Sequence, residues 1–169
     1  MLFEVGETLV YPHHGAVTIT EVESRAVKGV EAKFITLSVS DSELTIKIPV
    51  DKVEYIGVRD VIDDAGLEAV FAVLRAEVGE EADNWSRRFK ANQEKMASGN
   101  VLHVSEVVRD LWRRDEAKGL SAGEKRMLLK SKQILVSELA LALKKTHEEA
   151  GETLEGVLRS AVDLDTAPA

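Results

Sequence analysis

The hydrophobic period changes once along this chain, near Val58, and that change limits the folds it can adopt. Before it, short β-branched runs alternate with turns, which is typical of antiparallel strands. The clearest runs are 18–25, 33–39 and 44–50. Five short strands in so few residues remove their exposed edges by curling, so we predict a small SH3-like or Tudor-like antiparallel β-barrel over residues 1–55.

After Val58 the apolar residues recur at helical spacing. The expected helices are a stripe from Leu67 to Leu74, a segment from Trp85 to Ser98, residues 104–118, residues 121–145 and a short last helix around Leu154. Ser121 and Glu124 have the spacing of a capping box, which begins the fourth of these helices. We therefore expect an α+β protein whose all-α helical domain spans 56–162, followed by a disordered tail, 163–169.

Charge is distributed unevenly along the chain, although its total is only −8. Residues 84–132 hold twelve Lys and Arg against six Asp and Glu, a net charge of +6. The blocks 1–60, 61–83 and 133–169 have net charges of −4, −6 and −4. For any one helix, the basic residues are explained by solvation of a polar face. Because three consecutive helices carry them, we interpret the segment as a surface that follows a phosphate backbone.

The sequence lacks the residues that several classes of protein function require. The chain has no cysteine, its four histidines show no metal-binding spacing, and it contains no nucleophile elbow or phosphate-binding loop. It also lacks a signal peptide and an apolar run long enough to span a membrane. We therefore expect a cytoplasmic, non-enzymatic protein that needs no metal or cofactor, and we favour a monomer.

Trp85 admits two interpretations. It begins a helix directly after an acidic loop, with Phe89 four residues later, and a tryptophan in such a pair is ordinarily a core anchor. Alternatively, it projects from the basic face as a wedge or stacking platform for bases. Periodicity does not choose between these alternatives, whereas it places Trp112 on an unambiguous core face.

Four motifs resemble the CarD/CdnL family of bacterial transcription regulators. The N-terminal string Val5-Gly6-Glu7-Thr8-Leu9-Val10-Tyr11-Pro12-His13-His14-Gly15 looks like the signature that opens the family. The helical motifs are Asn84-Trp85-Ser86-Arg87-Arg88, Val107-Val108-Arg109-Asp110-Leu111-Trp112-Arg113-Arg114 and Leu120-Ser121-Ala122-Gly123-Glu124-Lys125-Arg126-Met127-Leu128. The likeness extends to about Lys144. Transcription-repair coupling factors share the first module, but the chain is too short for a translocase.

The resemblance implies a Tudor-like domain that docks on the β subunit of RNA polymerase and a helical domain that contacts promoter DNA. The DNA contacts lie at the upstream edge of the transcription bubble and stabilise the open complex, largely without sequence preference. The DNA-binding residues it implies are Trp85 as a minor-groove wedge and, on phosphates, Arg87, Lys90, Arg114, Lys125 and Arg126. The polymerase-binding residues it implies are Arg25, Leu37, Lys47 and Pro49.

Lys47 departs from the arginine of close relatives, and a single ammonium loses bidentate pairing with a carboxylate.

An alternative function is an adaptor whose helical domain recruits another protein instead of DNA.

Overall fold

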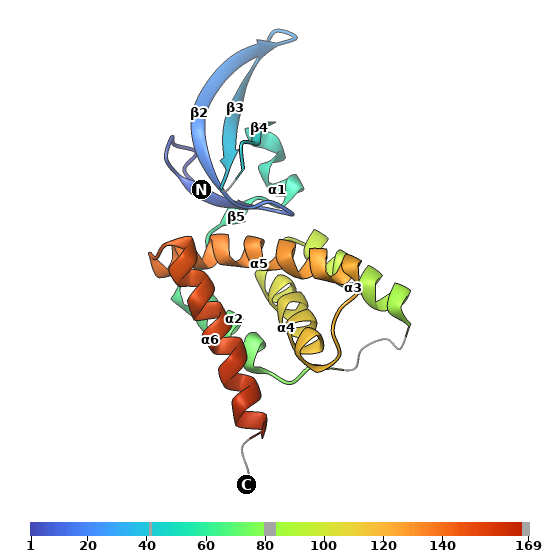
Figure 1. Cartoon of the computed structure of the whole chain (residues 1–169). Helices are drawn as coiled ribbons and strands as arrows, with labels where there is room; N and C mark the ends of the chain where they lie inside the picture. Colours follow the sequence, from blue (N-terminus) through green and yellow to red (C-terminus); the bar gives the residue numbers. More distant parts are fainter. Residues whose placement is uncertain (41, 80–83, 167–169) are drawn as a thin grey trace. The chain divides into compact units, whose positions relative to one another are not determined.

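The protein consists of two compact units, Met1–Val61 and Ile62–Ala169. In this computed structural model the described residues are 1–40, 42–79 and 84–166. The first unit is an antiparallel β-sheet and the second is all helical, as Figure 1 shows. The predicted α+β class, a small Tudor-like β domain followed by a helical domain, is confirmed.

In its described residues, the first unit contains five strands in the order β4-β3-β2-β1-β5. They are β1 (Thr8–Tyr11), β2 (Gly15–Val27), β3 (Val30–Val39), β4 (Thr45–Pro49) and β5 (Arg59–Asp60), with the short helices η1 (Val50–Lys52) and α1 (Val53–Ile56) before β5. Because β5 pairs with β1 through Leu9 opposite Asp60 and Val10 opposite Arg59, this unit extends beyond the predicted boundary at residue 55. Long-range pairing of so short a strand has no local sequence signal.

The two faces of this sheet differ because successive side chains of a strand point to opposite sides. On β3, Ile35, Leu37 and Val39 are buried, whereas Phe34 and Thr36 are only partly covered. A register shift between Ile19 and Glu21 interrupts the pairing of β2 with β3. Such bulges bend a strand, so they help a small sheet to curve around its core.

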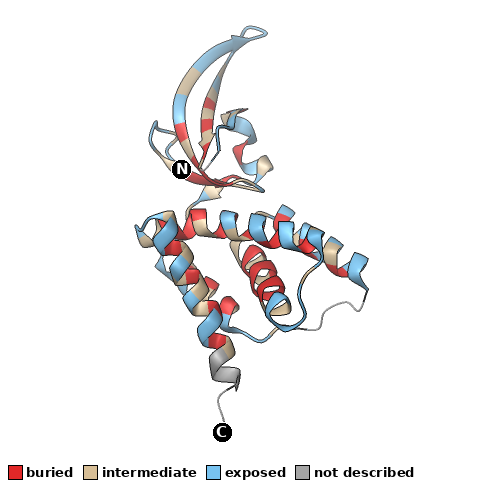
Figure 2. Ribbon diagram, viewed as in Figure 1, coloured by how far each residue is buried: buried red, intermediate tan, exposed pale blue. Residues whose placement is uncertain are grey.

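Helices α2–α6 form the second unit. They are α2 (Asp64–Arg75), α3 (Trp85–Ala97), α4 (Val101–Ala117), α5 (Ala122–Leu143) and α6 (His147–Thr166). The buried face of α4, which includes Val104, Val107, Val108, Leu111 and Trp112, lies in the core that the other helices cover (Figure 2). The apolar stripes therefore bury the faces that their spacing predicted.

Helix ends follow capping chemistry closely. Asn84 and Asn100 accept backbone N–H bonds at the starts of α3 and α4, and Ser121 and Glu124 form the predicted capping box of α5. The last helix is longer than expected, because α6 continues to Thr166 through part of the predicted tail. Residues 167–169 of that tail, and residues 80–83 of the acidic loop, lie outside the described residues.

Candidate nucleic-acid interface

Trp85 lies at the surface of the helical unit. It is the first residue of α3, and the Asn84 side chain caps this helix by accepting bonds from the backbone N–H of Ser86 and Arg87. The Trp85 side chain is 44% exposed and stacks on Phe89, with ring centroids 5.0 Å apart. The core interpretation of Trp85 is therefore wrong, whereas the core position of Trp112 is confirmed by its exposure of 6%.

The indole of Trp85 is fixed by the start of α5. Its Nε1–H donates to Glu124 Oε1 at 3.1 Å and to Ser121 Oγ at 3.2 Å. The other carboxylate oxygen of Glu124 accepts a bond from Arg88 Nε at 3.3 Å and lies 3.9 Å from Arg114 Nε. We call these five residues the Glu124 cluster: Trp85, Arg88, Arg114, Ser121 and Glu124. It joins α3, α4 and α5 at one point.

Glu124 is almost completely buried, yet it remains ionised. Burial alone would raise the pKa of this carboxyl, but the hydrogen bonds from Arg88 and Ser121 outweigh burial and hold the pKa below its ordinary value. The buried carboxylate of Glu124 is compensated by two guanidinium groups. The cluster is therefore a preformed element of the fold.

The twelve basic residues of 84–132 separate into two groups of six. One group is engaged within the unit: Lys95 with Glu106, Arg109 with Asp110, Lys132 with Glu155, Arg88 and Arg114 with Glu124, and Arg113 with the carbonyl of Leu74. The other group is exposed: Arg87, Lys90, Lys118, Lys125, Arg126 and Lys130. About half of the predicted basic surface is thus available to a polyanion.

The predicted phosphate-binding residues of α3 and α5 are exposed and lie within two residues of Arg88 or Glu124 in the sequence. Arg87 and Lys90 extend from α3 after Trp85, and Lys125 and Arg126 follow Glu124 on α5. Arg114 belongs to the cluster itself and is 25% exposed, so its charge is shared between Glu124 and the surface. An exposed aromatic ring flanked by cations has the chemistry to stack on a base while its neighbours pair with phosphates.

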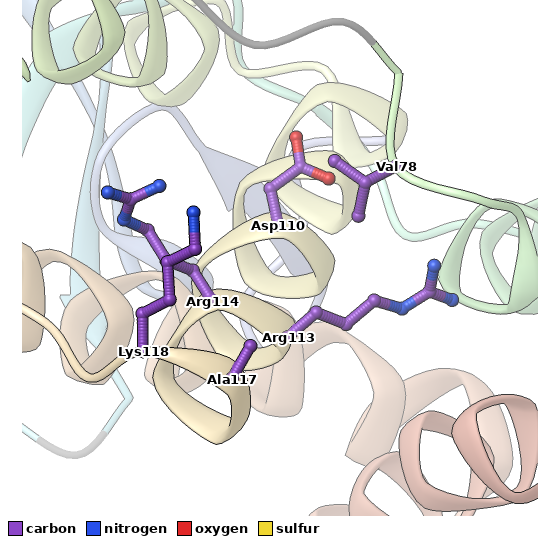
Figure 3. A pocket seen from close by; sticks show the side chains of 6 residues that line it. All are labelled: Val78, Asp110, Arg113, Arg114, Ala117 and Lys118. Carbon is purple, nitrogen blue, oxygen red and sulfur yellow. The ribbon is translucent and has the colours of Figure 1, made fainter. Parts of the chain in front are cut away.

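Two residues outside the predicted DNA-binding set contribute to this surface. Glu124 was identified only as a helix cap, because its contact with Trp85 joins residues far apart in the chain. Lys118 lies one helical turn after Arg114, and Figure 3 shows both side chains on the same side of α4 while Arg113 points the other way. These three cations, with Asp110, line a shallow cavity of about 200 Å³. Lys118 was counted in the basic segment 84–132, and its four-residue spacing from Arg114 was the signal that could have added it to the DNA-binding residues.

A second candidate surface lies on the β unit. Register places Glu23 opposite Phe34 and Phe34 opposite Pro49. On the same face, Arg25 lies two residues after Glu23 in β2, and Lys47 lies two residues before Pro49 in β4. Glu23 forms ion pairs with Arg25, at 2.9 Å, and with Lys47, and the Lys47 hydrogen bond is the main cause of its lowered pKa. The guanidinium of Arg25 lies 6.0 Å from the Phe34 ring. We call these five residues the outer β face.

Leu37 does not belong to the outer β face. Its register partners are Ile19 and Ile46, and its exposure is 0%. Because side chains alternate along β3, Leu37 points away from the face that carries Phe34. The prediction that Leu37 contacts a partner is therefore wrong, since it offers no surface, whereas Arg25, Lys47 and Pro49 remain accessible.

No helix in the described ranges is long and apolar enough to cross a membrane. Among the same residues, no group of three or more histidine and acidic side chains is placed to hold a metal ion.

Both units match known protein families. Residues 69–155 match a family described as CarD, C-terminal domain, and residues 3–62 match the CarD-like/TRCF RID domain. The putative transcription factor YdeB of Bacillus subtilis (strain 168) is 32% identical over 138 residues, which is 82% of this chain and 90% of YdeB. A solution NMR structure of the 72-residue N-terminal domain of Myxococcus xanthus CarD is 30% identical, over 34% of this chain and 76% of that one, with a TM-score of 0.30.

Proposed function

The chain belongs to the CarD family, and from this premise we propose that it regulates transcription by binding both RNA polymerase and promoter DNA. In this proposal the outer β face binds the polymerase β subunit. The helical unit binds DNA at the upstream edge of the transcription bubble, where Trp85 acts as a wedge that stabilises the open complex.

One observation carries the DNA part of the proposal: Trp85 is 44% exposed, and its indole is bonded to Glu124 of α5, whose carboxylate also pairs with Arg88 of α3 and Arg114 of α4. Inserting an apolar ring at a base step costs unstacking energy, which is smallest where the duplex is already open. Trp85 therefore has higher affinity for an open fork than for closed DNA, and this difference alone shifts the equilibrium toward the open complex.

The polymerase part rests on the chemistry of the outer β face. Arg25 and Lys47 present positive charge beside the apolar surfaces of Phe34 and Pro49. Both cations already pair with Glu23, so a partner carboxylate must compete with an internal one. Charge complementarity at such a face contributes to specificity and to the rate of association.

The two units cooperate in this proposal through their covalent connection. Exposed cations without base-specific contacts give weak, sequence-independent affinity for free DNA. Docking of the β unit raises the effective concentration of the helical unit near the bubble, so two weak contacts become one stable contact.

The wedge is tested with Trp85→Ala on a promoter that forms unstable open complexes. We expect a shorter open-complex lifetime with unchanged polymerase binding. Leu129→Ala is the control, because Leu129 is an exposed apolar residue of α5, 60% exposed, to which the proposal gives no role. An unchanged lifetime with a folded Trp85→Ala protein excludes the wedge.

Polymerase docking is tested with Arg25→Glu and Lys47→Glu. We expect both to weaken capture of the β subunit, whereas Lys33→Glu, an exposed position of β3 on the other side of the sheet from Phe34, should not. Equal capture by all three variants contradicts the assignment. Salt-dependent binding to a forked duplex then separates a DNA-binding protein from an adaptor, because an adaptor shows no such affinity.

A further inference from the structure

The indole N–H of Trp85 already donates hydrogen bonds within the protein. Nε1–H is the only hydrogen-bond donor of a tryptophan side chain, and the indole has no acceptor to offer a base edge. In Trp85 this donor lies within hydrogen-bond distance of both Glu124 Oε1 and Ser121 Oγ. The part of the residue that remains exposed is therefore apolar ring surface.

We propose that Glu124 is a positioning residue for Trp85: it holds the indole by its N–H and leaves only the ring surface for nucleic acid. The consequence of this inference for nucleic-acid binding rests on the proposed function, whereas the hydrogen bond between Trp85 and Glu124 is a property of the free protein. It assigns to the capping box of α5 a second role, in addition to starting the helix.

Glu124 is suited to this role because it is held from several sides. Its side chain is 3% exposed, Arg88 and Arg114 contact Oε2, and Ser121 contacts Oε1. An acceptor fixed in this way restricts the indole more than an exposed, mobile carboxylate could. The negative charge also strengthens the bond, since hydrogen bonds to ionised acceptors are roughly twice as strong as neutral ones.

The rings of Trp85 and Phe89 also lie against the first turn of α5. A methyl group at Gly123 would come within 3.5 Å of Phe89 and 3.8 Å of Trp85, which is ordinary contact distance. The stacked pair is therefore seated close to the α5 backbone at this position. Packing fixes the position of the Trp85 ring, and the N–H bond to Glu124 fixes its rotation.

A consequence for specificity follows from the occupied donor. Base sequence is read by hydrogen bonds to base edges, whereas stacking on an aromatic face tolerates every base. With its N–H donated to Glu124, Trp85 discriminates only through the cost of opening a base step. The preference of the wedge is then for easily unstacked steps and not for a particular base.

The inference is tested in the full-length protein by NMR of the two indole N–H resonances. Trp85→Phe removes one resonance and so assigns it. In Glu124→Ala, we expect the Trp85 N–H to exchange with water at least about tenfold faster, because it loses a charged acceptor. Glu149→Ala is the matched control: Glu149 and Thr146 exchange the same reciprocal cap bonds at the start of α6, without a tryptophan.

Glu124→Ala leaves Arg88 buried beside a cavity, so a second variant is needed if it does not fold. Glu124→Gln keeps the volume and a neutral acceptor, and we expect a changed Trp85 N–H shift and a smaller increase in its exchange. An unchanged resonance and exchange rate in a folded variant at position 124 overturns the inference. So does an equal effect of Glu149→Ala.

A forked DNA duplex added to the wild-type protein tests the specificity consequence. We expect the Trp85 ring resonances to shift while its N–H remains protected from exchange. Loss of protection at saturating DNA overturns the claim that the donor stays with Glu124. An absence of any DNA binding contradicts the proposed function instead, and leaves the result on the free protein intact.

Discussion

The salt dependence of DNA binding provides a quantitative test of the interface. Each phosphate that a cation neutralises adds about −0.9 to the slope of log affinity against log salt. If the five predicted DNA-binding cations (Arg87, Lys90, Arg114, Lys125 and Arg126) each contact one phosphate, the slope is about −4.5, which is the upper limit because Arg114 also pairs with Glu124. Raising salt from about 50 to about 200 mM should then weaken binding by about 500-fold.

Removing one cation should change this slope by a defined amount. We expect Lys125→Gln to make the slope shallower by about 0.9, measured by titrating a forked duplex at several salt concentrations. Arg114→Gln should have a smaller effect, because Glu124 shares the Arg114 charge. Lys132→Gln is the control, since Lys132 pairs with Glu155. An unchanged slope in Lys125→Gln, or an equal change in Lys132→Gln, refutes the division into exposed and internally paired cations.

Three further predictions concern the folded state and are measured by urea unfolding. Glu155→Ala should lower the free energy of unfolding by about 1–3 kcal/mol, because it leaves the buried Trp112 N–H without its acceptor; Glu152→Ala, at an exposed position of the same helix, should not. The difference in the free energy of unfolding between the wild-type protein and Glu124→Gln should be largest above pH 4.5 and should decrease as the pH falls further, because folding lowers the pKa of Glu124. A difference that does not change with pH contradicts this. Leu37→Ala should cost about 2–5 kcal/mol without weakening β-subunit capture per folded molecule, and weaker capture would restore Leu37 to the docking face.

Most of the fold was predictable from periodicity, because the two periods are local properties of the sequence. The capping box at Ser121 and Glu124 was found in this way, as was the buried face that includes Trp112. β5 was missed because two residues carry no period, and only the pairing of Arg59 and Asp60 with Val10 and Leu9 of β1 defines the strand. The end of α6 was placed too early, since helix ends are weakly specified by sequence.

The site was predictable only in part, because it depends on contacts between residues that are far apart in the sequence. Whether a cation is free depends on tertiary neighbours: Arg87 and Arg88 are adjacent in sequence, yet one is exposed and the other is buried against Glu124. The error at Leu37 was avoidable. Alternation with Phe34 in β3 already places Leu37 with the apolar residues, whereas the family resemblance places it on the docking face.

Glu124 both caps α5 and accepts the hydrogen bond from Trp85, and this double role has a consequence on heating. Helix termini open at lower free energy than the core to which they belong. Opening of the first turn of α5 therefore releases the indole while Leu135 and Leu139, further along the same helix, are still packed. On heating, the stabilisation of an opened promoter that we propose for Trp85 should decline below the temperature at which the helical unit unfolds.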